Sequence, residues 1–210
     1  GFLTPDSLFE FDALTYEVSP LKSLPPKFDA TGLVVEQFFA ESTDGTQIPY
    51  FAVHREDIPL DGKTPTLLYG YGGFQISLNP GYNGTTGRLW LEKGGAYILA
   101  NIRGGGEFGP AWHQAGLKLN RQRVYDDFIS VAEDVIEKGI TSPPHLGIMG
   151  GSNGGLLMGV MLNQRPDLWN AVVVQVPLLD MLRYHLLLAG ASWVDEYGSP
   201  EILEERAFLE

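Results

Sequence analysis

The chain has 210 residues, 44% of them hydrophobic, and a formal net charge of −12 at pH 7. This length supports one sizeable hydrophobic core with an appendage rather than two separate cores. The acidic balance argues against binding of nucleic acid or an anionic membrane surface through a basic patch. Because the sequence contains no cysteine, disulfides, a thiolate nucleophile and Cys-ligated zinc are excluded.

No apolar run approaches the about 20 residues needed to cross a bilayer. The first residues, Gly-Phe-Leu-Thr-Pro-Asp, have neither the basic region nor the apolar region of a signal peptide. A soluble protein is expected; its compartment is left open, with the cytoplasm favoured over the periplasm. The four histidines lack the spacing of a metal-binding motif, so the sequence predicts no metal site and no cofactor.

Residues 1–30 are rich in proline and carry scattered aromatic side chains, which indicates a strand or two followed by a linker at 23–27. Two extended runs follow, Val34 to Glu41 and Gln47 to His54. The intervening Thr-Asp-Gly-Thr has the turn chemistry of a β-hairpin.

Short apolar runs and helical patterns alternate in the rest of the chain. Buried-type strands are predicted at 66–69, 96–102, 146–149 and 171–176, and helices at 121–138, 154–164 and 182–189. Such alternation predicts an α/β protein whose sheet is mostly parallel, with helices on both faces. Ligand chemistry in such proteins lies at the carboxyl ends of the strands, which here are glycine-rich turns.

One of these turns carries the pattern G-x-S-x-G. Gly150-Gly-Ser-Asn-Gly154 follows an apolar strand and precedes an apolar helix, which is the context that a nucleophile elbow requires. Ser152 would present its hydroxyl above the sheet, at a helix N-terminus that favours developing negative charge. The alternative is a plain glycine turn.

Two other glycine-rich turns have competing interpretations. Gly70-Tyr-Gly-Gly73 follows the strand expected beside the elbow strand, so Tyr71 is a candidate oxyanion donor, or else simply packs. The run Gly104 to Gly109 formally matches a dinucleotide-binding fingerprint. Glu107 would then face the pyrophosphate, so a structural loop with an Arg103–Glu107 ion pair is favoured.

Asp180 and His185 follow Ser152 in the order of a hydrolase triad. A separation of five residues does not suit two triad members that come from different strand ends, so this pair is the disfavoured alternative. Trp193 and Tyr197 lie in a segment expected to return over the active-site face. Aromatic side chains there either pack in the core or bind an apolar ring of the substrate.

Several of these motifs together resemble the prolyl oligopeptidase family of serine peptidases. The likeness covers nearly all of residues 30–200. The matching segments are Leu67 to Phe74, Ala100 to Gly109, Tyr125 to Phe128, Gly150 to Leu157, Gln164 to Leu168 and Ala191 to Gly198.

The resemblance implies the α/β-hydrolase fold and a role for each matching residue. Ser152 would be the nucleophile, with the Asn153 backbone N–H and the Tyr71 hydroxyl as oxyanion donors. Trp193 would stack on a substrate proline ring, in a pocket that Phe74, Leu178 and Tyr197 also line. The substrates would be short proline-containing peptides.

The family places its triad Asp and His after two further strands, and only 58 positions follow Ser152. We therefore expect residues 31–210 to be the N-terminal portion of the catalytic domain, ending before its last strands, and residues 1–30 to end a preceding β-propeller. The 210 residues should be inactive alone. They should self-associate, or pair with a C-terminal fragment, through an exposed sheet edge. The alternatives are an acyl-aminoacyl or dipeptidyl-type peptidase or an esterase of the same superfamily, and a non-catalytic association module.

Overall fold

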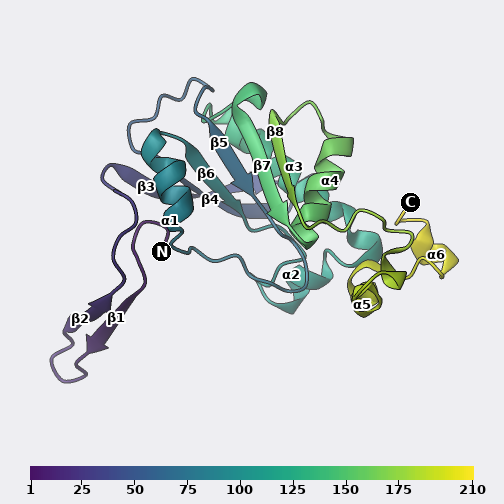
Figure 1. Ribbon diagram of the computed structural model, residues 1–210, viewed down its shortest axis with the longest axis horizontal. Coiled ribbons are helices and arrows are strands. Elements are labelled where there is room, and N and C mark those ends of the chain that lie inside the picture. Colours follow the sequence, from purple (N-terminus) through teal and green to yellow (C-terminus); the bar gives the residue numbers. More distant parts are fainter.

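The computed structural model describes all 210 residues. A short β-hairpin precedes a six-stranded sheet whose strands are connected by helices, and two short helices end the chain (Figure 1). The elements are β1 Ser7–Phe11, β2 Val18–Ser23, β3 Leu33–Glu41, β4 Gln47–Arg55, β5 Thr66–Tyr69, α1 Gly84–Leu89, β6 Ala96–Ala100, α2 Pro110–Gln114, α3 Gln122–Glu137, β7 Leu146–Gly151, α4 Asn153–Gln164, β8 Ala171–Gln175, α5 Val194–Tyr197 and α6 Leu203–Arg206.

The large sheet has the strand order β3-β4-β6-β5-β7-β8. Strand β4 is antiparallel to both β3 and β6, whereas β6, β5, β7 and β8 are parallel to one another. The predicted hairpin is therefore confirmed as β3 and β4, and the predicted parallel strands form the other part of the sheet. In this order β5 lies directly beside β7, so the turns that follow these two strands are neighbours.

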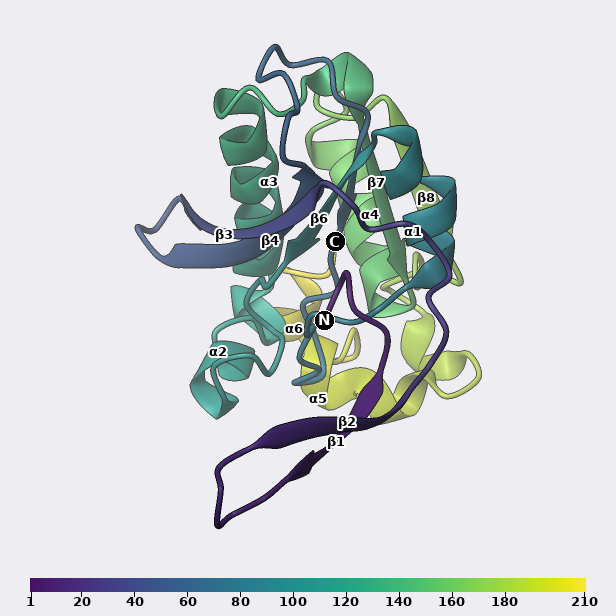
Figure 2. The same cartoon turned by 90° about the vertical axis from the view of Figure 1, so that its left-hand side faces the viewer.

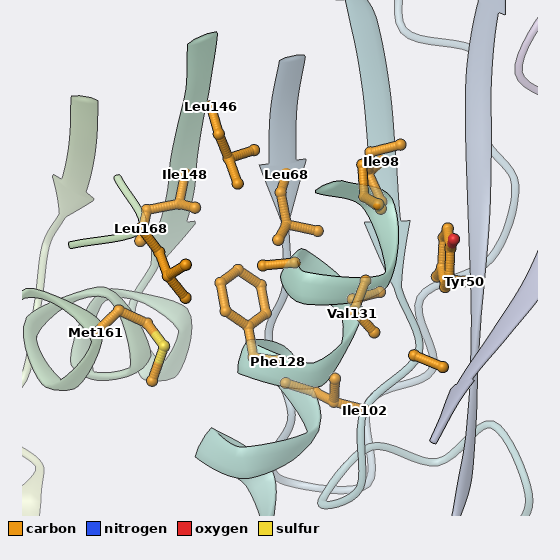
Figure 3. Packing of buried hydrophobic residues seen from close by; sticks show 14 of the residues in the cluster. Tyr50, Leu68, Ile98, Ile102, Phe128, Val131, Leu146, Ile148, Met161 and Leu168 are labelled. Carbon is orange, nitrogen blue, oxygen red and sulfur yellow. The ribbon is translucent and has the colours of Figure 1, made fainter. Parts of the chain in front are cut away.

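Both faces of the sheet are covered, and the alternation of side chains along the strands explains how. Leu68, Ile98 and Ile148 belong to the larger core, which they form with α3 and α4 (Figure 3). Their neighbours Tyr69 and Leu99 face the other side and pack with the segment around α1. Figure 2 shows α3 and α1 on opposite sides of the sheet. The predicted arrangement of helices on both faces is thus confirmed.

Helix α3 fills the centre of the larger core. Its residues Val124, Phe128, Val131 and Val135 recur at helical spacing and are fully or almost fully buried. The strip that they form packs on the sheet, as the sequence pattern predicts. The observed helix begins and ends within one residue of the predicted bounds.

The first residues form an appendage. Strands β1 and β2 pair only with each other, and this hairpin extends away from the large sheet (Figures 1 and 2). Its side chains are almost all exposed. Phe2 and Phe28, which flank the hairpin, are instead buried in a second, smaller hydrophobic cluster, on the face of the sheet where Leu99 packs. The hairpin thus confirms the strands predicted for this segment, while its assignment to a β-propeller stays a prediction.

The helix predicted over 182–189 is wrong. A single 3₁₀ turn occupies Tyr184–Leu186, and Leu188 has a positive φ of 48° that a continuous helix does not allow. The Tyr184 side chain is fully buried, and its hydroxyl donates to the carbonyl of Gly198 at 2.5 Å. This segment therefore follows the packing of Tyr184 rather than the helical spacing of its leucines.

The predicted Arg103–Glu107 ion pair is also wrong. Arg103 is buried and donates from Nε and Nη2 to the Asp127 carboxylate, at 2.9 and 2.6 Å, and from Nη1 to Asp44 at 2.6 Å. Glu107 accepts instead from the backbone N–H of Leu78 at 2.8 Å. Arg103 binds the two aspartates rather than Glu107 because Asp127 offers it a two-oxygen contact and Asp44 offers a second carboxylate. This cluster ties the β3–β4 turn to α3.

None of the helices is long and apolar enough to cross a membrane.

Candidate active site

Ser152 lies at a sharp turn between β7 and α4. Its φ of 57° and ψ of −118° place a non-glycine residue in a strained region of backbone space. It is the residue that precedes the first turn of α4. The strand-to-helix context predicted for this serine is thus present.

Glycine is required on both sides of Ser152 because the chain passes itself closely there. A Cβ atom on Gly150 would collide with the carbonyl of Gly154. A Cβ atom on Gly155 would lie 2.6 Å from the carbonyl oxygen of Gln175, at the end of β8. Any larger residue would force the serine away from the edge of the sheet.

Two groups lie beside Ser152 that can donate to an oxyanion. The backbone N–H of Asn153 belongs to the first turn of α4, where an N–H has no acceptor within the helix. Tyr71 lies in the turn that follows β5, the strand paired with β7. Burial raises the pKa of the Tyr71 phenol, and the neighbouring Ser152 side chain opposes this shift. Tyr71 therefore keeps its proton, and its hydroxyl lies near that of Ser152.

Ser152 opens into an apolar pocket of about 710 Å³. Phe74, Leu178, Trp193 and Tyr197 all line this pocket together with Ser152. The Phe74 and Tyr197 rings meet edge to face, with centroids 5.7 Å apart. The remaining lining residues are Tyr71, Ile76, Asn153, Val176, Pro177, Leu179, Asp180, Tyr184, Leu187 and Leu188. The structure thus brings every predicted site residue to one cavity.

No histidine lines the pocket. His54 contacts Glu36 at 2.9 Å and His113 contacts Glu196 at 2.8 Å, and His145 lies just before β7, at the opposite end of the strand from Ser152. His185 lies 3.5 Å from Glu201. None of the four histidines therefore lies in the pocket beside Ser152.

Asp180 lines the pocket, but its carboxylate accepts from Arg183 Nε at 2.7 Å. The same pairing lowers the pKa of Asp180. Asp180 and His185 make no hydrogen bond to each other, and the Nδ1 atom of His185 has no partner. These contacts give no support to this pair as a triad.

The loop at 104–109 has a structural explanation. A Cβ atom on Gly104 would collide with the carbonyl of Gly72, so Gly104 lets this loop pack against the turn that carries Tyr71. The next helix, α2, has only five residues and begins at Pro110. This geometry favours the structural loop over the dinucleotide interpretation.

Two buried charged residues beside the pocket were missed by the sequence analysis. Arg121 and Glu196 form an ion pair of 3.0 Å behind the turn that carries Ser152 and Asn153. They lie 75 positions apart in the chain, and neither belongs to a motif that suggests a role. The one signal for Glu196 is its place in the segment Ala191 to Gly198, which carries part of the family resemblance.

The fold and the elbow together indicate the class of protein to which the chain belongs. A mostly parallel sheet with helices on both faces and a strained serine between strand and helix is the α/β-hydrolase fold. Residues 83–208 match the model of the prolyl oligopeptidase family, and the chain belongs to that family. This region is therefore part of a serine peptidase family, as its motifs predict.

The proteins that are similar to this chain are named as peptidases. It is 66% identical over 209 residues to an uncharacterized peptidase of Sinorhizobium fredii, and 41% identical over 205 residues to the prolyl endopeptidase of Elizabethkingia meningoseptica. These alignments cover 100% and 98% of the chain, and 29% of each relative. A solved structure of a post-proline cleaving enzyme from Rickettsia typhi superposes with a TM-score of 0.92 at 46% identity, over 99% of this chain and 30% of that one. The chain thus spans less than a third of the length of these relatives.

Proposed function

We propose that the chain is part of the catalytic domain of a serine peptidase that cleaves short peptides on the carboxyl side of proline. The observation that carries this proposal is that Ser152, at a strained elbow, opens into an apolar pocket walled by Trp193 and Tyr197. A proline ring is compact and apolar, so an aromatic wall suits it. The relative from Elizabethkingia meningoseptica, named a prolyl endopeptidase, supports the same substrate.

The proposed chemistry is acyl transfer through Ser152. The Oγ atom of Ser152 bonds to the carbonyl carbon of the proline residue, while its proton passes to a histidine base and then to the amine that departs as the C–N bond breaks. The Asn153 N–H and the Tyr71 hydroxyl donate to the oxyanion that forms. Water then attacks the ester carbonyl, which releases the proline-ended peptide and restores Ser152. No step requires a metal or a cofactor.

We propose that the histidine and aspartate of the triad come from residues outside these 210. Residues 31–210 would then form the N-terminal portion of the hydrolase domain, and the β1–β2 hairpin would end a preceding β-propeller. The length of the relatives, more than three times that of this chain, supports a larger enzyme. Without a histidine base, Ser152 stays protonated near neutral pH and attacks an amide poorly. The 210 residues alone should therefore be inert toward proline peptides.

The outer edge of β8 supports a proposal on association. This strand pairs only with β7, so its other edge carries N–H and C=O groups with no strand beside them. Such an edge is a template for a further strand. The 210-residue chain should pair there with a second copy, or with a C-terminal segment of its parent protein supplied separately. A chain that sediments as a stable monomer at micromolar concentration, both alone and after addition of the C-terminal segment, would contradict this proposal.

Substrate comparison on the full-length protein tests the proposed function. The protein is assayed with a blocked peptide amide that ends in proline, the matched alanine amide, an acetylated amino-acid amide and a simple ester. We expect turnover of the proline amide at least a hundredfold above that of the alanine amide. Preference for the acetylated substrate or the ester would instead favour an acyl-aminoacyl peptidase or an esterase. Absence of all turnover would favour a non-catalytic module.

A further inference from the structure

A buried ion pair lies behind the turn that carries the proposed oxyanion donors. Arg121 precedes α3 and Glu196 belongs to α5, and their side chains are 9% and 5% exposed. Two charges removed from water are stabilised only where further hydrogen bonds satisfy them. The partners of the two side chains therefore indicate what the pair holds in place.

The Glu196 carboxylate binds the loop that leads from Tyr71 into the pocket. Its Oε1 atom accepts from Arg121 and also from the backbone N–H of Phe74 at 2.9 Å. Its Oε2 atom contacts Nε2 of His113 at 2.8 Å. Phe74 has a positive φ of 54°, a conformation that a bulky residue adopts only where its surroundings impose it. Glu196 thus supports a strained residue of the pocket wall.

Arg121 binds the other side of the site. Its Nη2 atom donates to the side-chain oxygen of Asn153, and the Tyr197 hydroxyl donates to the same oxygen at 2.8 Å. The guanidinium group also lies 5.1 Å from the centre of the Tyr197 ring. At its other end, the Asn153 side chain donates to the carbonyl of Tyr71 at 2.5 Å. Asn153 is therefore fixed at both ends of its amide.

We propose that Glu196 and Arg121 are positioning residues that hold the oxyanion donors and the aromatic pocket wall in one arrangement. This inference rests on the proposed function. Neither residue lines the pocket, so both act through Phe74, Asn153 and Tyr197. Because displacement of a catalytic group by about 1 Å costs roughly a hundredfold in rate, loss of the pair should lower kcat. It should also weaken the preference for proline, because Phe74 and Tyr197 form the wall.

The test uses the full-length protein and charge-neutral variants of similar size. Glu196→Gln keeps an oxygen that can accept from Phe74, and Arg121→Met keeps an unbranched side chain without the guanidinium group. We expect each to lower kcat for the proline amide at least tenfold and to narrow the preference for proline over alanine. Because the two act as one unit, the double variant should lose little more than the worse single variant. Arg121→Lys, which keeps the charge, should retain an intermediate kcat.

Glu133 and Arg165 supply a matched control. They form an ion pair of 2.6 Å whose side chains are 52% and 31% exposed, and neither contacts the pocket. Glu133→Gln and Arg165→Met should leave kcat and the proline preference within twofold of the wild type. Rates are normalised to the folded fraction from circular dichroism, and Arg121→Lys carries the test if the neutral variants unfold.

Folded variants at Glu196 and Arg121 with wild-type kcat and selectivity would overturn the inference. An equal loss toward proline and alanine substrates without a fall in kcat would also overturn it, because that pattern indicates a general effect on binding. A wild-type protein that neither cleaves the proline amide nor reacts with a phosphonate at Ser152 would refute the proposed function itself. The two failures are therefore distinguishable.

Discussion

Replacement of Tyr71 by phenylalanine isolates one oxyanion donor. The change removes only the hydroxyl beside Ser152 and leaves the ring that lines the pocket. Loss of one of two donors to an oxyanion costs about 10²- to 10³-fold in kcat, or about 2.7–4 kcal/mol. The remaining donor, the Asn153 N–H, is part of the α4 backbone and is unaffected. We therefore expect kcat to fall about a hundredfold and KM to change less than threefold.

The assay measures kcat and KM of the full-length protein for a proline amide between pH 7 and pH 9. Burial raises the pKa of Tyr71 above its ordinary value of about 10, so the phenol should still donate at the top of this range. The ratio of wild-type to Tyr71→Phe kcat should accordingly stay constant across it. A change confined to KM would mean that the ring only binds substrate. A ratio that falls toward one near pH 9 would mean that the phenol ionises and does not act as described.

Three further changes test other parts of the structure. Trp193→Ala should raise KM for the proline amide about tenfold and leave the alanine amide unaffected, since an aromatic contact contributes about 0.5–1.5 kcal/mol; equal losses on both substrates would exclude a role in proline recognition. Asp127→Asn should lower the free energy of unfolding by about 1.5–3 kcal/mol in urea titrations, because it neutralises one of the two carboxylates that bind the buried Arg103 and leaves Asp44 as the other. The substitution Asp126→Asn, at its partly exposed neighbour, provides the control. A loss of unfolding free energy below about 1 kcal/mol for Asp127→Asn, as for the control, would contradict this. Burial raises the pKa of Tyr184 to about 12, whereas an unfolded tyrosine ionises near pH 10. The contribution of the Tyr184 phenol to the free energy of unfolding is therefore complete below pH 10. It falls by about 1.4 kcal/mol per pH unit between pH 10 and pH 12. Tyr184→Phe should flatten the pH dependence of unfolding by that slope, and parallel curves would refute it.

The sequence predicted the strands and the elbow well because their signals are local. Continuous apolar runs at β5, β6 and β7 reflect burial on both faces of the sheet. The glycines around Ser152 are required by close contacts within a few residues of the chain. Tyr71 was a candidate donor from its glycine-rich turn alone, although a tyrosine there is equally compatible with packing. The expectation that Trp193 stacks on proline came from the family resemblance.

The errors and omissions all involve contacts between distant segments. Arg103 was paired with the nearby Glu107, whereas its partners Asp44 and Asp127 lie 59 and 24 positions away. The leucines of 182–189 have helical spacing, but the burial of Tyr184 decides the path of the chain. Arg121 and Glu196 meet only because α3, α4 and α5 converge behind the pocket. No spacing rule along the chain indicates such a meeting.

Labelling of Ser152 in the full-length protein tests the central claim most directly. The protein is treated with a phosphonate that reacts with activated serines, digested and analysed by mass spectrometry. We expect one modified site, Ser152, labelling that a proline-containing peptide slows, and a kcat that falls by about 10⁴-fold or more in Ser152→Ala with folding intact. Labelling at another serine, or near-normal cleavage of the proline amide by Ser152→Ala, would contradict the assignment of Ser152 as the nucleophile.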